Sequence, residues 1–297
     1  MATIFINSFE PRCGVHQYGL RIYNSIKDRL CIDYAAVGNL SEYLEAIKGY
    51  EKVVINYYCS LFYYLNKSTQ VDSIKYFYID HTDLFYDVQP GKRINNDPNH
   101  IDGIPRPLMF NDISTYPPTD LENPVIGSFG FGFLHKSFEK LVELVQSQFD
   151  TATIRLLIPA AFWGDENGEE AKLTAQRCRE IITKPGIILS VCHDFLPDEE
   201  VFRFLQGNDL NLFLYPGYPN RACSSVPDYA LGVNRPIAIS DSDMFRHIYD
   251  DSICAYKTPL RTIIQNGPVF NQKFRELWSK DAMVLSMQKH LDLQYRE

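Results

Sequence analysis

A glycine-rich stretch in the second half of the chain ends on a lysine that can meet an anion. Residues 127–136 are Gly-Ser-Phe-Gly-Phe-Gly-Phe-Leu-His-Lys, between an expected strand and an expected helix. Glycines such as Gly130 let a ligand approach the backbone closely, and Lys136 near the helix start is a point charge for a phosphate. A tight strand-to-helix turn without a ligand can have the same composition, so the stretch leaves both interpretations open.

A second loop, residues 215–225, combines a basic side chain with a helix start. Two prolines and a glycine follow Tyr215, Arg221 supplies a bidentate cation, and Cys223, Ser224 and Ser225 lead into the expected helix. Free backbone N–H groups and hydroxyls at a helix N-terminus attract anions. Ordinary N-capping by serine is the alternative.

A third loop lies after the apolar run 187–191. His193, Asp194 and Phe195 offer an aromatic ring and exposed amides that can hold a nucleotide base. Capping of the next helix by the same loop is equally compatible with these residues.

The three loops occupy equivalent places in a regular alternation of strands and helices. Each follows a strand, and in a doubly wound sheet ligands bind outside the carboxyl ends of the strands, where helix N-termini point. The expected strands are 124–128, 153–159, 187–191, 210–215 and 236–240, and the expected helices are 136–149, 167–182, 198–206 and 224–232. The second half is therefore predicted to be a doubly wound α/β domain.

The first half alternates less regularly, and a proline-rich segment separates it from the second. Expected strands are 3–6, 31–37, 52–56 and 74–79, and expected helices are 15–30, 40–47 and 60–65. Residues 89–124 read as a long connection without regular elements. We expect domains at 1–121 and 122–275, and a helical C-terminal segment, 276–297, that packs on the first domain.

Composition excludes several functional classes. The net charge of −8 and the pI of about 5.4, without a basic stripe, exclude a nucleic-acid partner. Seven scattered cysteines without a Cys-x-x-Cys pair predict reduced thiols and no metal site. The longest apolar run, 53–65, is too short and too polar to cross a bilayer, and we expect a soluble cytoplasmic protein without a transmembrane segment.

Taken together, residues 126–247 resemble the donor-binding domain of GT-B glycosyltransferases, in particular the family 4-like retaining enzymes (glycosyl transferases group 1). Four blocks carry the resemblance in order and spacing: 130–136, 193–201, 209–216 and 230–237. The resemblance implies two Rossmann-like domains that face a cleft, with a shortened N-terminal acceptor domain. It also implies that the positions of Ser224, Ser225 and Lys136 bind the diphosphate of a nucleotide sugar without a metal ion.

The chain departs from this family pattern at its charged positions. Phe131 stands where the family has an arginine, and we expect Arg155 or Arg221 to replace that phosphate cation. The family's two glutamates, eight residues apart, correspond to Arg221 and Tyr229. Asp228 lies beside the second position, and we expect it on the helix surface.

The first half matches the acceptor domain more loosely. Gly14 corresponds to a glycine loop after the first strand, where the backbone approaches the donor phosphate. His81 follows a later strand, in the place of a cleft histidine that contacts the donor sugar or stabilises the leaving group. A structural hydrogen-bonding role is the alternative for His81, and it is favoured for His16.

The resemblance therefore predicts a glycosyltransferase of hexosyltransferase type. It would move a sugar from a UDP- or GDP-sugar to a hydroxyl of a glycan or other acceptor, with retention and without a metal. Lys136, Arg221 and His81 are the expected catalytic residues. Two alternatives stay open at this point: a non-catalytic nucleotide-sugar-binding module, and a nucleotide-sugar epimerase on the same scaffold.

Overall fold

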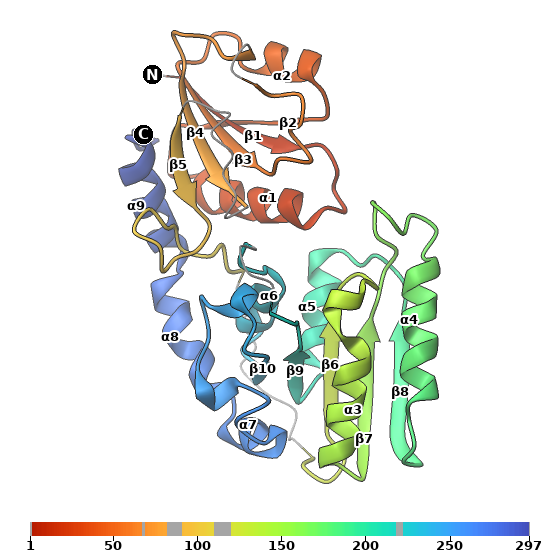
Figure 1. Cartoon of the computed structure of the whole chain (residues 1–297). Coiled ribbons are helices and arrows are strands. Elements are labelled where there is room, and N and C mark those ends of the chain that lie inside the picture. Colours follow the sequence, from red (N-terminus) through yellow and green to blue (C-terminus); the bar gives the residue numbers. More distant parts are fainter. Residues whose placement is uncertain (1, 67–68, 82–90, 110–119, 218–221, 297) are drawn as a thin grey trace. The chain divides into compact units, whose positions relative to one another are not determined.

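The structure, a computed structural model, describes residues 2–66, 69–81, 91–109, 120–217 and 222–296. It divides into two compact units. The N-terminal unit contains residues 1–108, 220–223 and 276–297, and the C-terminal unit contains residues 109–219 and 224–275. Each unit is built on one parallel β-sheet (Figure 1).

The sheet of the N-terminal unit has the strand order β2-β1-β3-β4-β5, and all of its pairs are parallel. The chain leaves β1 toward β2 and then crosses to β3 on the other side, so the switch point lies between β1 and β3. The strands are β1 (Thr3–Ser8), β2 (Asp33–Val37), β3 (Lys52–Tyr57), β4 (Lys75–Asp80) and β5 (Lys92–Asn95).

Helices cover both faces of this sheet. Helices α1 (Gly14–Ile26) and α9 (Lys280–Leu291) contact each other and bury one face. Helix α2 (Leu40–Ala46) covers the other face, where Tyr43 is buried among strand residues. Strands that are buried on both faces read as apolar runs, which is why β1 and β3 are visible in the sequence.

A buried lysine fixes the end of the C-terminal helix. Lys52, at the start of β3, donates hydrogen bonds from Nζ to the backbone oxygens of Leu291 and Asp292, each at 2.7 Å. The last carbonyls of a helix have no partner within the helix, and a cation there also opposes the negative end of the helix dipole. Lys52 thereby ties α9 to the sheet of the N-terminal unit.

The sheet of the C-terminal unit has the order β10-β9-β6-β7-β8, again with parallel pairs only. The chain runs from β6 through β7 to β8 and then returns to β9 on the other side of β6. The switch point therefore lies between β6 and β9. The strands are β6 (Val125–Phe129), β7 (Thr151–Leu157), β8 (Gly186–Cys192), β9 (Leu210–Phe213) and β10 (Ile237–Ile239).

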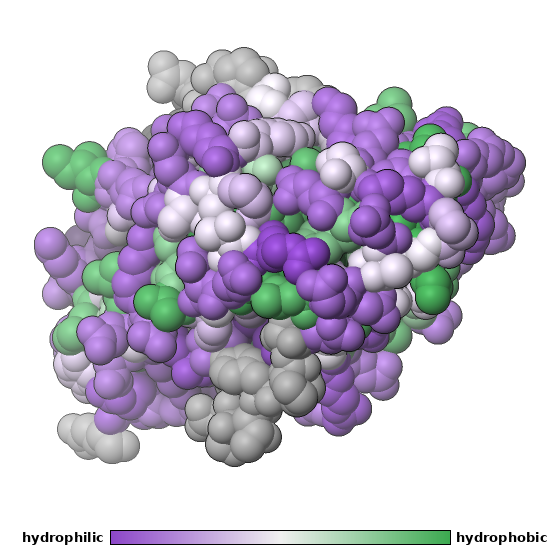
Figure 2. Space-filling model, turned by 90° about the horizontal axis from the view of Figure 1, so that it is seen from below, coloured by the Kyte–Doolittle hydropathy of each residue, from purple (hydrophilic) through white to green (hydrophobic). Residues whose placement is uncertain are grey.

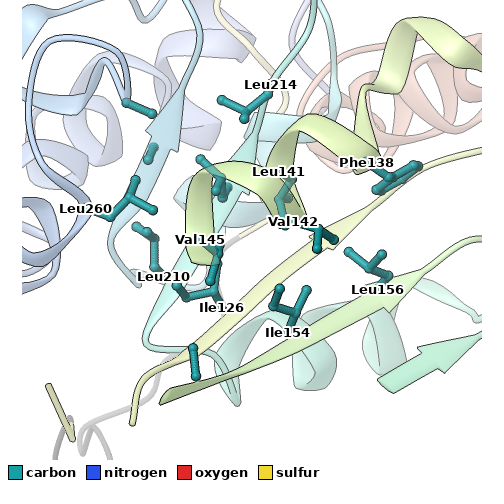
Figure 3. Close-up of a cluster of buried hydrophobic side chains, with 14 of the residues drawn as sticks. Ile126, Phe138, Leu141, Val142, Val145, Ile154, Leu156, Leu210, Leu214 and Leu260 are labelled. Carbon is teal, nitrogen blue, oxygen red and sulfur yellow. The ribbon is translucent and has the colours of Figure 1, made fainter. Parts of the chain in front are cut away.

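The helices of this unit bury a continuous apolar core. Figure 3 shows α3 lying across the strands, with Leu141, Val142 and Val145 pointing toward Ile126 and Ile154. Helix α7 adds Leu260 to the same core. The helices are α3 (Phe138–Gln148), α4 (Glu169–Glu180), α5 (Asp198–Gln206), α6 (Val226–Gly232), α7 (Leu260–Asn266) and α8 (Val269–Leu277).

The α/β class with two parallel, Rossmann-like sheets is confirmed, and three details of the expected elements are wrong. Residues 60–65 form turns in place of a helix. The segment 89–124, expected to lack regular structure, contains β5. The expected C-terminal helix is broken between α8 and α9, where the Ser279 side chain caps α9 by accepting from the amide of Ala282.

The surface offers no extended apolar face in the view of Figure 2. There, outside the atoms drawn in grey, hydrophilic residues dominate and hydrophobic ones form small separate groups. None of the helices in the described parts of the chain is long and apolar enough to cross a membrane.

Candidate functional site

Two loops meet at the switch point of the C-terminal unit. Lys136 comes from the loop after β6 and Tyr215 from the loop after β9, and β6 and β9 are paired neighbours. Lys136 Nζ lies 2.7 Å from Tyr215 Oη and 4.2 Å from the centre of its ring. The structure thus brings two of the predicted site residues into direct contact at the place where doubly wound sheets bind ligands.

The backbone of Tyr215 is fixed by a serine at the end of β10. Ser240 Oγ accepts a hydrogen bond from the Tyr215 amide at 3.0 Å and donates one to the Tyr215 carbonyl at 2.6 Å. Ser242 holds the carbonyl of Pro216, and the Tyr215 ring packs on Phe245 at 4.7 Å. The prediction missed Ser240 and Ser242; hydroxyl residues directly after an expected strand were the available signal.

The loop that carries Lys136 is fixed by its glycines. Gly130 has a φ of +149°, and a Cβ there would lie 3.4 Å from Cε of Lys136, so the lysine side chain runs along bare backbone. Gly132 lies against the backbone of Ala171 at the start of α4, where a Cβ would be 2.6 Å from the Cα. Thr174 Oγ1 also donates to the Gly132 carbonyl at 2.8 Å.

The serines before α6 are arranged differently from the expectation. The Ser224 amide donates to the carbonyl of Met244 at 2.8 Å, so this amide is already occupied within the protein. Ser224 Oγ accepts a long, 3.4 Å bond from the Val226 amide, and Ser225 is the N-cap residue without a side-chain capping bond. Cys223 is buried, and Arg221 lies outside the described residues. Phosphate binding by these residues stays a prediction.

The expectation that Asp228 lies on the helix surface is wrong. Asp228 is buried in the first turn of α6, and its Oδ1 lies 3.9 Å from Nε2 of His247, which is also buried. Tyr229, at the position of the second family glutamate, donates to Asp198 Oδ1 at 2.9 Å. A seven-residue helix packed between other elements buries most of its residues, which the sequence of α6 alone does not reveal.

Arg155 does not replace the missing phosphate cation. It lies within β7, and its guanidinium donates to the Asn208 side chain at 2.9 Å and stacks over the Phe204 ring at 4.7 Å. Phe204 belongs to the last turn of α5, and Asn208 lies between α5 and β9. Both residues therefore lie at the amino end of β9. Burial lowers the pKa of Arg155, consistent with a packed structural role.

The loop after β8 keeps an aromatic ring at the surface. His193 Nδ1 donates to the carbonyl of Ile158 at 2.8 Å, which ties the loop to the residue that follows β7. Asp194 accepts a weak bond from the Cys192 thiol, and Phe195 is 43% exposed. A nucleobase contact of these residues stays a prediction that this geometry permits.

In the N-terminal unit, a chain of amides spans the switch point. Asn56 Nδ2, on β3, donates to Asn7 Oδ1, on β1, at 2.9 Å and to the Val15 carbonyl at 2.7 Å. Asn7 Nδ2 in turn donates to the carbonyl of His16 at 2.9 Å. The two asparagines therefore hold the first turn of α1, where Gly14 is exposed and an added Cβ would have none of the described atoms within 4 Å. Asn7 and Asn56 were not predicted, although both end apolar runs.

His16 and His81 both form hydrogen bonds within the protein. His16 Nδ1 donates to the Ser8 carbonyl. His81 is buried, with Nε2 at 2.7 Å from Asn56 Oδ1 and Nδ1 at 3.2 Å from Asn96 Nδ2. Both ring nitrogens of His81 are engaged, and a catalytic role for His81 stays a prediction that requires one of these bonds to break.

The described residues contain no group of three or more histidine, cysteine or acidic side chains arranged to hold a metal ion. Lys136 lies at the carboxyl edge of the β6–β9 pair, where its ammonium group and the Tyr215 hydroxyl can both donate to an anion. The chemistry available is charge stabilisation of a phosphate-like group.

Comparison with known proteins gives matches in structure only. No protein-family model matches the sequence, and no curated protein sequence matches it. Among solved structures, Anabaena Alr3699/HepE in complex with UDP-glucose is similar, with a TM-score of 0.71 and 11% identity over 98% of this chain and 99% of that one.

Two further glycosyltransferases align over nearly the whole chain. AviGT4, which is involved in avilamycin A biosynthesis, has a TM-score of 0.66 and 11% identity over 98% of this chain and 96% of its own. The lipopolysaccharide outer core galactosyltransferase WaaB has a TM-score of 0.64 and 11% identity over 98% and 99%. The chain therefore has the GT-B fold of these glycosyltransferases, as its sequence motifs predicted.

Proposed function

We propose that this protein is a glycosyltransferase that moves a sugar from a nucleoside-diphosphate sugar to a hydroxyl group of an acceptor. The bond between the anomeric carbon and the diphosphate oxygen breaks, and its electron pair leaves with the diphosphate. The acceptor oxygen forms the new bond to that carbon, and its proton is released to the departing diphosphate. The task of the protein is to stabilise the negative charge that develops on this leaving group.

The observation that carries the proposal is the contact of Lys136 with Tyr215 at the β6–β9 switch point. An ammonium group can only donate, so the Tyr215 oxygen accepts, and the tyrosine keeps its own proton for a further acceptor. Lys136 and Tyr215 together can therefore give a diphosphate both a positive charge and a neutral donor. Charge-assisted bonds of this kind are about twice as strong as neutral ones.

The comparisons support a nucleotide-sugar donor. Alr3699/HepE has the same fold over its full length and has structures with UDP and with UDP-glucose. We therefore propose a UDP-sugar as the first donor to test, and a GDP-sugar as the second. The acceptor is proposed to be a glycan or another hydroxyl compound.

Finer properties of the reaction are part of the proposal and rest on the sequence resemblance. Retention is expected from the family 4-like motifs, and the anomeric configuration of the product in proton NMR tests it. Independence of a metal is expected because Lys136 takes the place of a cation, and turnover that is unchanged by a chelator tests it. A reducing, cytoplasmic location is supported by seven free cysteines.

Exchange of Lys136 gives the central test. We expect Lys136→Ala to weaken binding of UDP or GDP by about 10- to 100-fold, since a hydrogen bond to a charged group contributes about 1.5–3 kcal/mol. Turnover of the active donor is expected to fall at least as much. Lys140→Ala is the matched control, because Lys140 is an exposed lysine four residues further along, in α3. Both variants change the net charge equally.

The outcomes separate the proposal from its alternatives. Equal binding by wild type and Lys136→Ala, or equal loss in both variants, would contradict the site. Binding of a nucleotide sugar without slow hydrolysis and without transfer would indicate a non-catalytic module. Conversion of the free nucleotide sugar into its epimer would indicate an epimerase.

A further inference from the structure

A row of rings runs away from the Lys136–Tyr215 pair across the C-terminal unit. The ring centres of Tyr215 and His135 are 6.2 Å apart, those of His135 and Phe133 are 5.8 Å apart, and those of Phe133 and Trp163 are 6.4 Å apart. The row leads from the β6–β9 switch point to the loop after β7. Neither Phe133 nor Trp163 was singled out from the sequence.

Trp163, at the end of this row, is 71% exposed although its loop is tightly fixed. The buried Asp165 accepts hydrogen bonds from the amides of Glu170 and Ala171, at 2.9 and 3.0 Å, and so caps α4 with both carboxylate oxygens. Gly164 lies against Phe133 with a φ of +76°, which an L-residue rarely adopts. The bonds of Asp165 and the packing of Gly164 therefore hold the loop in a form that presents the Trp163 ring to solvent.

We propose that Trp163, supported by Phe133, is the platform on which the nucleobase of the donor stacks. This inference rests on the proposed function, in which Lys136 and Tyr215 bind the diphosphate. A nucleoside diphosphate carries a charged group at one end and a flat π-system at the other, joined by a ribose. The row has matching groups at its two ends. The Lys136 ammonium and the Tyr215 hydroxyl suit the diphosphate, and the exposed indole of Trp163 suits the base.

The surroundings of Trp163 favour a base over a sugar ring. A saccharide on an aromatic ring also needs hydrogen-bond partners beside that ring. Two acids follow Trp163 in its loop. Asp165 has both oxygens bound to amides at the start of α4, and Glu166 accepts from the amide of Gly164 at 3.0 Å. A base needs only a π-face, and the exposed Phe195 after the neighbouring strand β8 offers a second ring at the same carboxyl edge of the sheet.

The indole itself reports on the ligand. The chain has two tryptophans. Trp278 is only 5% exposed, so Trp163 is the tryptophan that a ligand in solution can contact. We expect UDP or GDP to quench tryptophan fluorescence of the wild type, and inorganic pyrophosphate to bind without quenching. Trp163→Phe keeps a π-face and is expected to bind the nucleotide while the quenching disappears.

Calorimetry on a truncated side chain measures the stacking. We expect Trp163→Ala to weaken UDP or GDP binding between about 5- and about 150-fold, the range for loss of one base–aromatic stack. Pyrophosphate affinity should stay at the wild-type value. Val269→Ala is the matched control, since Val269 is 66% exposed in α8, outside the proposed site, and carries no ring; its nucleotide affinity should be unchanged.

Each other result overturns the inference. Equal loss of nucleotide and pyrophosphate affinity in Trp163→Ala would show that Trp163 only shapes the loop. Unchanged nucleotide affinity, or quenching by a free hexose and not by the nucleotide, would exclude a nucleobase platform. If wild type binds UDP or GDP and Lys136→Ala does not, these results leave the donor site standing; if wild type binds neither, the proposed function itself fails.

Discussion

At the scale of single residues, an asparagine decides where the proton of His81 lies. Asn56 Nδ2 donates to Asn7 and to the Val15 carbonyl, so the Asn56 oxygen faces His81 Nε2 and can only accept. Nε2 therefore carries the proton, and Nδ1 accepts from Asn96. His81 is thus held as a neutral imidazole within a chain of oriented donors.

This arrangement predicts a pH-dependent stability. Burial, and then the charge of Arg106, lowers the pKa of His81 to about 3 in the folded state, against an ordinary value of about 6.5. The unfolded chain therefore binds a proton more readily, and the His81 contribution is fully present above pH 6.5 and is lost as pH falls toward 3. We expect the free energy of unfolding to fall over this range less steeply in His81→Gln than in wild type, measured by urea denaturation at several pH values.

His100→Gln serves as the comparison, because His100 is an exposed histidine of the same unit. It should keep the wild-type slope between pH 6.5 and 3. Nitrogen NMR shifts of His81 should report the Nε2–H form throughout the range from pH 5 to 8. A His81 ring that titrates near pH 6.5 would contradict its burial and its hydrogen bonds with Asn56 and Asn96.

The position of a site residue was predictable where neighbouring residues in the sequence determine it. Lys136 follows a glycine-rich strand end, and its place at the carboxyl edge is set by that order. The place of Arg155 depends on the register of β7, which turns its side chain toward the end of α5. Asp228 is buried beside His247, a residue of a later loop, so no local sequence pattern could reveal its burial.

At the scale of elements, the turn between β6 and α3 is set by close backbone packing. A Cβ on Gly132 would lie 2.6 Å from Cα and 2.8 Å from the amide nitrogen of Ala171, and both are backbone atoms that cannot rotate away. We expect Gly132→Ala to lower the free energy of unfolding by about 1–3 kcal/mol, the usual cost of overpacking. It should also weaken pyrophosphate binding, because the same turn carries Lys136.

Gly217→Ala is the matched exchange for stability, since a Cβ there would meet no atom of the described residues within 4 Å. Its free energy of unfolding should be unchanged within about 0.5 kcal/mol or slightly raised. Urea denaturation compares the two variants. A Gly132→Ala protein as stable as wild type would show that α4 can move away from the turn.

Elements with a strong local pattern were predictable, and those fixed by neighbours were not. Strands β1, β3 and β6 are apolar runs between polar turns, which is the signal of a strand buried on both faces. Strand β5 is four residues long and lies in a proline-rich segment, and it forms by pairing with β4. Residues 60–65 have the apolar spacing of a helix. In the structure their backbone forms turns, and the side chains of Phe62 and Leu65 are nevertheless buried.

At the scale of the whole molecule, the chain closes its first unit with its last residues. Met283, Val284, Met287 and Leu291 of α9 belong to the same buried cluster as Phe5 of β1 and Ile22 of α1. Lys52 binds the end of α9, and the bridge between Leu30 and Tyr295 adds a backbone link. The N-terminal unit therefore cannot complete its core until the C-terminal unit has been synthesised.

This discontinuity predicts that a substitution in the core of α9 destabilises strands and helices near the N-terminus of the chain. Met287 is fully buried and Leu285, on the same helix, is 59% exposed. We expect Met287→Ala to destabilise the N-terminal unit by about 2–5 kcal/mol, through lost burial and the cavity left behind, and Leu285→Ala to change stability by less than about 0.5 kcal/mol. In hydrogen exchange followed by mass spectrometry, Met287→Ala should lose protection in β1 to β5 and α1, while β6 to β10 keep theirs. Equal loss in both sheets would mean that the two units unfold as one, and equal effects of the two variants would remove α9 from the core.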